Sequence, residues 1–95
     1  MQFVMICEDK PDSLALRMST REAHLAYIGE KGGMIKLAGP MIGDDGESMI
    51  GSVFILEADS KADVEAMNAS DPYSKAGLFA QVTIKAFRQV IPAPG

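Results

Sequence analysis

The sequence contains few of the residues that build disulfide-linked, zinc-stabilised or nucleic-acid-binding proteins. It holds one cysteine, Cys7, so no disulfide can form within the chain, and we expect a reducing, cytoplasmic location. One histidine, His24, and that single cysteine are too few for a structural zinc site. Nine Lys and Arg stand against thirteen Asp and Glu, and this net charge of -4 argues against a nucleic-acid partner.

Long hydrophobic runs and cofactor motifs are also missing. No apolar run approaches the roughly 18 residues of a membrane-spanning helix, and the first residues are typical of a strand rather than a signal peptide, so no membrane partner is predicted. No phosphate loop, dinucleotide fingerprint or metal constellation occurs, so any chemistry would be free of cofactor and metal. The composition, 47% hydrophobic and 23% charged, predicts one globular domain over residues 1–95, with 91–95 as a tail.

Hydrophobic patterning predicts the order strand, helix, strand, strand, helix, strand. The expected strands are 2–7, 34–41, 49–57 and 78–90, and the expected helices run from about 20 to 31 and from 60 to about 69. Gly39-Pro40 should interrupt the second strand, and the polar turn 43–48 should join strands two and three as a hairpin. This order predicts an α+β fold of the ferredoxin-like βαββαβ type, a four-stranded antiparallel sheet with both helices on one face.

Helix starts are marked by two capping-box patterns and one Asp-Pro pair. Ser19 precedes Glu22 by three residues, and Ser60 opens the second helix in the same way. Asp71 before Pro72 is typical of the cap of a further short helical turn. With the first helix beginning near Thr20, Arg21, His24, Leu25 and Ile28 fall on one stripe, which Leu25 and Ile28 predict to be buried. An inward imidazole at His24 then needs a partner.

The third strand is apolar on both faces. Met49, Val53 and Ile55 alternate with Ile50, Phe54 and Leu56, yet two helices can cover only one side of the sheet. An exposed apolar sheet face of this size is an association surface. The sequence therefore predicts a homodimer packed sheet to sheet.

Four separated motifs, in order over essentially the whole chain, resemble the YciI-like (YCII-related) proteins. They are Asp12-Ser13-Leu14 with Arg17, Arg21 and Ala23-His24-Leu25; Ala38-Gly39-Pro40; Gly51-Ser52; and Asp71-Pro72-Tyr73 with Gly77. The resemblance implies a dimeric α/β barrel of two ferredoxin-like protomers. It also implies an active-site cleft with a His and an Asp, matched here by His24 and Asp71, and with Ser52 nearby. One class in that family is similar to a dehydrochlorinase acting on chlorinated hydroxyhydroquinone, and muconolactone isomerases share the architecture.

Each candidate residue also has a plain structural interpretation. From the residues alone, His24 is more simply a semi-buried histidine bonded to backbone, and Asp71 is a helix cap; the resemblance makes them a general base and its orienting carboxylate. Ser52 either lines a pocket or bonds to backbone beneath a helix, and without a G-x-S-x-G elbow it is no nucleophile. Cys7, inside the first strand, is a small core residue.

The remaining candidates would bind substrate. Arg17 and Arg21 are the groups suited to a carboxylate, phenolate or halide, unless they form a solvated pair or a salt bridge with Glu22 or a loop Asp. Gly39 and Pro40 would shape the chain beside the pocket. Tyr73 is interpreted as half-buried packing, with its hydroxyl as the alternative, a pocket group.

Two classes of function follow from these residues. The first is a cofactor-free lyase, isomerase or dehydrochlorinase in which His24 and Asp71 remove a proton from a small, hydroxylated or halogenated aromatic molecule. The alternative is a non-catalytic small-molecule-binding or regulatory protein with the same fold and pocket, since both use the same residue types. A third interpretation, a structural interaction domain, leaves His24 and Asp71 to packing and capping alone.

Overall fold

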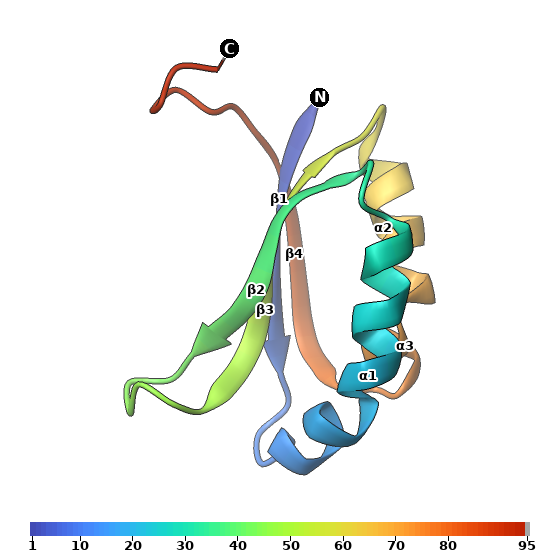
Figure 1. The fold of residues 1–95 in the computed structure, drawn as a ribbon, viewed down its shortest axis with the longest axis vertical. Coiled ribbons are helices and arrows are strands. Elements are labelled where there is room, and N and C mark those ends of the chain that lie inside the picture. Colours follow the sequence, from blue (N-terminus) through green and yellow to red (C-terminus); the bar gives the residue numbers. More distant parts are fainter. Residues whose placement is uncertain (95) are drawn as a thin grey trace.

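The computed structural model describes residues 1–94, so the last residue of the predicted 91–95 tail lies outside the described part. Four strands and three helices make up the fold (Figure 1). In chain order they are β1 (Gln2–Asp9), α1 (Leu14–Glu30), β2 (Ile35–Ile42), β3 (Met49–Glu57), α2 (Lys61–Ser70), α3 (Pro72–Lys75) and β4 (Phe79–Phe87).

The strands form one antiparallel sheet in the order β2-β3-β1-β4. β1 lies in the middle, where Met5 is opposite Phe54 of β3 on one side and Ile84 of β4 on the other. All three helices lie against one side of the sheet, and the other side is open in Figure 1. This is the ferredoxin-like βαββαβ arrangement that the sequence predicts, with α3 added as a short turn before β4.

The first helix begins six residues earlier than predicted. Ser19 lies inside α1 and its Oγ donates to the carbonyl of Leu16 at 3.0 Å instead of capping Glu22. The turn after Pro11 ends the loop, and Asp12 takes a positive φ of 55° there. Residues 14–18 (LALRM) are all good helix formers, so nothing delays the helix until Thr20.

The other predicted starts and turns hold with small changes of boundary. Ser60 Oγ accepts from the Asp63 amide at 3.3 Å and caps α2, and Asp71 caps α3 with Pro72 in its first turn. β2 and β3 form the predicted hairpin. Pro40 does not interrupt β2, because this strand is at the sheet edge, where a missing N–H is tolerated. β4 ends at Phe87 rather than residue 90.

The hydrophobic core lies between the sheet and the helices. β1 contributes alternate residues, and β3, β4 and α2 complete the cluster: Phe3, Met5, Cys7, Phe54, Leu56, Val64, Met67 and Ile84. Tyr27 ties α1 to α2, since its hydroxyl donates to the carbonyl of Met67 at 2.8 Å. Within residues 1–94 no helix has the length and apolar character to cross a membrane. The cytoplasmic location stays a prediction.

Candidate functional site

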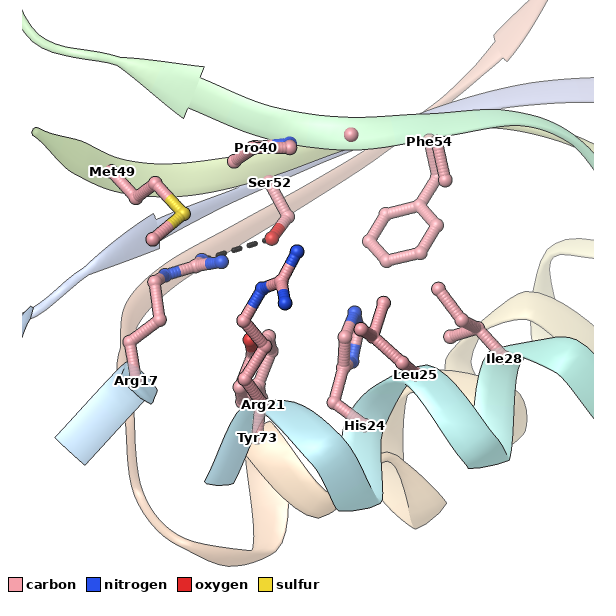
Figure 2. A pocket seen from close by; sticks show the side chains of 12 residues that line it. Arg17, Arg21, His24, Leu25, Ile28, Pro40, Met49, Ser52, Phe54 and Tyr73 are labelled. Atoms are coloured by element: carbon pink, nitrogen blue, oxygen red, sulfur yellow. Dashed lines mark hydrogen bonds between the residues drawn. The ribbon is translucent and has the colours of Figure 1, made fainter. Parts of the chain in front are cut away.

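A cavity of about 250 Å³ lies between α1 and the β2–β3 part of the sheet. Figure 2 shows side chains from α1 pointing across it toward β3. Apolar side chains form most of its wall, together with a few polar groups that converge on it. The lining residues are Arg17, Arg21, His24, Leu25, Ile28, Ala38, Gly39, Pro40, Met49, Ser52, Phe54 and Tyr73. A volume of this size suits a single small ring compound.

His24 and Asp71, which are 47 residues apart in sequence, are in direct contact. The imidazole Nδ1 lies 2.9 Å from Oδ1 and 3.0 Å from Oδ2 of Asp71. Asp71 is fully buried, and the His24 residue is 6% exposed. A carboxylate can only accept hydrogen bonds, so Nδ1 is the ring nitrogen that carries the proton. Nε2 makes no hydrogen bond within residues 1–94 and is the ring nitrogen available to a molecule in the pocket.

Local structure fixes Asp71 before any ligand binds. Its Oδ1 accepts from the Tyr73 amide at 2.9 Å, and Pro72 holds the first turn of α3 in a helical backbone conformation. The capping role and the contact with His24 therefore coexist, because one carboxylate has several acceptor positions. The cap sets the direction of the carboxylate, and the carboxylate sets the ring orientation of His24.

The ring of Tyr73 stacks on the face of the His24 imidazole. The two ring centroids are 3.9 Å apart with an angle of 14° between the planes, which is a stacked arrangement. On the pocket wall the Arg17 guanidinium carbon lies 4.7 Å from the Tyr73 ring centroid. Tyr73 is 1% exposed, not half-buried as expected, and burial raises the pKa of its hydroxyl, although the nearby arginines oppose this.

Arg17 makes hydrogen bonds to Asp9 and Ser52. Its Nε and one Nη donate to the Asp9 carboxylate at 2.7 and 3.0 Å, and the same Nη donates to Ser52 Oγ at 2.9 Å (Figure 2). Arg17 is 2% exposed, and burial alone would lower its pKa, but the hydrogen bonds and charge of Asp9 outweigh burial and raise it. Of the interpretations of Arg17, the structure shows a salt bridge with an Asp, but this residue, Asp9, is the last of β1 and does not lie in the loop.

Ser52 is neither bonded to backbone nor free. Its hydroxyl lines the pocket and accepts from Arg17. Gly51 before it is required by close approach of the strands, because an added Cβ would overlap the carbonyl oxygen of Cys7. This packing keeps Ser52 pointing to the helix side. Gly39 and Pro40 lie opposite, on the edge strand β2, and Pro40 is paired in register with Ser52.

Arg21 and Leu25 lie at the solvent side of the pocket, and this corrects one expectation. Leu25 was predicted to be buried, but it is 44% exposed, and Arg21 is exposed as well. The inward face of α1 instead carries Arg17 and His24, which are seven residues apart. Both lie in the helix because α1 is longer than predicted and includes Arg17 in its first turns.

All eight predicted site residues lie at or directly behind one cavity. His24, Ser52, Arg17, Arg21, Gly39, Pro40 and Tyr73 line it, and Asp71 is behind His24. The sequence reasoning missed Asp9, which holds Arg17. Its signal was present: an acidic residue directly after an apolar strand and eight positions before an arginine. It also missed the apolar wall formed by Ile28, Met49 and Phe54.

The arrangement can move a proton and hold a small ring. It offers one imidazole with an open nitrogen and a fixed carboxylate, next to two guanidinium groups and apolar walls. Within residues 1–94 no three His, Cys, Asp or Glu side chains gather as metal ligands would. Every buried side-chain nitrogen or oxygen in that range has a hydrogen-bond partner.

A ferredoxin-like domain with a His–Asp contact beside a small cavity defines the structural class, and comparison with known proteins gives the family. A model of the YCII-related domain matches residues 1–88, so the chain belongs to the YCII-related family. The Escherichia coli O6:H1 protein YciI is 36% identical over 97 residues, covering 95% of this chain and 99% of that protein.

Two solved structures extend the comparison. The 5-chloro-2-hydroxyhydroquinone dehydrochlorinase of Burkholderia phenoliruptrix, in complex with 2,5-dihydroxybenzoquinone, is similar with a TM-score of 0.84 and 36% identity. That likeness covers 93% of this chain and 94% of the other. An antibiotic biosynthesis monooxygenase shares the fold alone, with a TM-score of 0.55 and 12% identity over 94% of this chain and 97% of that chain.

Proposed function

We propose that this protein is a cofactor-free lyase of the dehydrochlorinase type, with His24 as the general base and Asp71 as the carboxylate that orients it. The observation that carries this proposal is the contact of Asp71 with Nδ1 of His24, which leaves Nε2 open to a cavity of about 250 Å³. The substrate class is a small hydroxylated, halogenated aromatic ring.

The proposed reaction removes one proton and one chloride from the ring. His24 first moves a proton from a ring hydroxyl to the carbon that bears chlorine. It then accepts a second hydroxyl proton through Nε2, and the O–H electron pair becomes part of a new carbonyl. Chloride leaves with the electron pair of the C–Cl bond. The ring loses HCl and becomes a hydroxyquinone, and no external oxidant is needed.

Asp71 supports each proton transfer through Nδ1. It keeps the proton on Nδ1, so that Nε2 is the acceptor, and its negative charge stabilises the imidazolium that forms. Tyr73, stacked on the ring, prevents rotation of the imidazole out of this orientation. Positioned general bases of this kind typically contribute about 10²- to 10⁴-fold to rate.

The proposal is supported by likeness to a dehydrochlorinase that is 36% identical over nearly the whole chain. The test is anaerobic incubation with 5-chloro-2-hydroxyhydroquinone, with chloride release and quinone absorbance as readouts. We expect turnover by the wild type and a loss of about 10²-fold or more in folded His24→Gln. Equal turnover by the two proteins would end this mechanism. Saturable binding of the ring without conversion would favour the non-catalytic binding protein instead.

We also propose that two copies associate through the open side of the sheet. Apolar side chains occupy its centre in register across neighbouring strands, with Val53 of β3 opposite Ile6 of β1 and Ile55 opposite Val4. Leu37 of β2 continues this surface and is 65% exposed in the single chain. The helices cover only the other side (Figure 1).

The oligomeric state is tested by light scattering at micromolar concentration. The wild type should have the mass of two chains. Val53→Lys places a charge at the centre of the open side and should shift the mass toward that of one chain. Met18→Lys is the matched control, because Met18 is 51% exposed on α1, a helix that covers the opposite side of the sheet. A wild-type mass of one chain would contradict the proposal.

A further inference from the structure

The two arginines of the pocket are in different electrostatic states. Arg17 and Arg21 are one helical turn apart on α1, and both side chains extend toward the sheet in Figure 2. Arg17 is 2% exposed and makes two hydrogen bonds to Asp9 and one to Ser52. Its charge is compensated by Asp9, and its Nε and one Nη donate to protein acceptors. A ligand that bound these two nitrogens would have to break the contacts with Asp9 and Ser52.

Arg21 carries an uncompensated charge. It is exposed, and within residues 1–94 it makes no hydrogen bond and no ion pair with another side chain. Its side chain nevertheless lines the cavity beside His24 rather than pointing away from it (Figure 2). The five donors of a guanidinium are arranged to bind a carboxylate or another anionic oxygen. The pocket therefore has one positive group without an internal partner.

We propose that Arg21 binds an ionised oxygen of the ligand, so that the pocket selects planar ring compounds that are already anions. The proposal deepens the proposed function and rests on it for the role of His24. Arg17 instead positions the pocket wall by holding β1, β3 and α1 together.

The spacing of the two groups sets the shape of the ligand. Arg21 and His24 are three residues apart, a rise of roughly 4.5 Å along the helix, which is about the breadth of one aromatic ring. The proposed ligand is a ring with an ionised oxygen directed at Arg21 and a hydroxyl directed at Nε2 of His24. Phe54 and Ile28 form an apolar wall of the cavity on the side of His24 away from Arg21 (Figure 2).

The charge also helps the proposed reaction. As Nε2 takes a proton, electron density moves onto the oxygens of the ring, and a guanidinium at its far edge stabilises this density. A neutral ring analogue gains little from Arg21 in the bound state, because it carries no negative charge until its proton has left. Selectivity for anions and assistance to proton removal thus come from the same residue.

The test measures binding without turnover. 4-Hydroxybenzoate and 4-hydroxybenzamide have nearly the same shape and differ in charge, and 2,5-dihydroxybenzoquinone provides an ionised ring oxygen. Each is titrated against the protein by calorimetry or by NMR. We expect the wild type to bind at least one of the two anions about tenfold more tightly than 4-hydroxybenzamide. Preference for the benzoate would indicate a carboxylate ligand, and preference for the quinone an ionised ring oxygen.

Arg21→Gln should remove the preference for anions while leaving 4-hydroxybenzamide binding and the unfolding temperature unchanged, because Arg21 has no internal partner. Arg21→Lys should retain part of the preference, and added salt should weaken it in the wild type. The matched control is Arg88→Gln, which removes the same charge from an exposed position outside this cavity. Equal affinity of the wild type for the anions and the amide, or an unchanged preference in Arg21→Gln, would overturn the proposal.

These outcomes are separable from those of the proposed function. Anion preference is measured at equilibrium, so it can hold in a protein that turns over nothing. Conversely, chloride release that depends on His24 but is unaffected by Arg21→Gln would support the catalytic proposal and contradict this one.

Discussion

Two buried carboxylates hold two basic side chains in this molecule and leave them in different conditions. Asp9 accepts from Arg17 at 2.7 and 3.0 Å, and Ser52 accepts a further hydrogen bond from the same guanidinium. Asp71 contacts Nδ1 of His24 at 2.9 and 3.0 Å, yet nothing in residues 1–94 binds Nε2. We call the Asp9–Arg17 pair the closed pair, because Asp9 compensates the charge of Arg17 and Ser52 binds the same guanidinium. We call the Asp71–His24 pair the open pair, because Nε2 has no partner within residues 1–94.

This difference shows that a buried side chain is not necessarily a reactive one. Both pairs are nearly inaccessible and both line or support the same cavity, so neither burial nor an acidic partner identifies a chemical role. What distinguishes them is the acceptor left over after the protein contacts are counted. His24 keeps a nitrogen that can accept a proton from a ligand, whereas Arg17 has only donors, and its Nε and one Nη bind Asp9 and Ser52. The following predictions test whether the two pairs differ in this way.

Asp9→Asn should give the largest loss of stability. It leaves the Arg17 charge buried without its carboxylate, and breaking a buried pair from one side costs about 3–5 kcal/mol. Urea unfolding measures the change. Asp12→Asn is the matched control, because Asp12 is exposed in the adjacent turn and Asn tolerates its positive φ. A midpoint shared by Asp9→Asn and Asp12→Asn would show that the closed pair does not stabilise the fold.

Asp71→Asn should reduce turnover by about 10- to 100-fold, the range typical of a residue that orients a reacting group. Asn keeps an oxygen for the Tyr73 amide but no longer carries the charge that stabilises the imidazolium. Steady-state chloride release measures the effect. Asp63→Asn, an exposed change in the first turn of α2, should leave the rate unaltered. Full activity of folded Asp71→Asn would remove Asp71 from the mechanism.

Ser52→Ala should cost about 1.5 kcal/mol of stability, because it removes an acceptor from the charged guanidinium of Arg17. If Ser52 belongs to the closed pair and not to the reaction, the rate at saturating substrate should stay near that of the wild type. Urea unfolding and chloride release on the same sample give both values. A stable variant with a large rate loss would place Ser52 in the chemistry.

The pKa of the Cys7 thiol depends on burial and on the carboxylates of both pairs. Burial first, and then the charges of Asp71 and Asp9, raise the pKa of Cys7 from 9.0 to about 12. Above pH 9 the unfolded chain loses this proton while the folded chain keeps it, so stability should fall by about 1.4 kcal/mol per pH unit up to pH 12. At pH 7 the effect is absent.

Cys7→Ser isolates this effect, because a serine hydroxyl does not titrate in the range. The difference in unfolding free energy between the two proteins should therefore change with pH above 9 and be constant below it. Parallel pH profiles for wild type and Cys7→Ser would show that the pKa of Cys7 is not raised in the folded protein.

The sequence predicts the order of strands and helices along the chain. It also predicts two features of the Asp71–His24 pair, the cap at Asp71 and the inward position of His24. Alternation and turn residues give the βαββαβ order, and Asp71-Pro72 marks a cap because capping is a local interaction. Helical spacing predicts His24 to be inward, as it is. That His24 and Asp71 meet depends on the packing of α1 against α3, which no local pattern encodes, and the family resemblance supplied that pairing.

The closed pair was harder to foresee. Ser19 and Glu22 carry a capping pattern inside a helix, and this pattern placed the helix start too late, so Arg17 fell before the predicted first helix. Because α1 starts at Leu14, the side chain of Arg17 projects back to the end of β1, where Asp9 lies. Ser-x-x-Glu is uninformative when no residue before it ends or prevents a helix.

The most direct test of the central claim is the tautomer of His24, read from the nitrogen resonances of its ring by NMR. The chain has a single histidine, so the signals need no further assignment. We predict a proton on Nδ1 and a bare Nε2 that responds when a ring ligand is added. A proton on Nε2, or an Nε2 resonance indifferent to every ligand that binds, would contradict it.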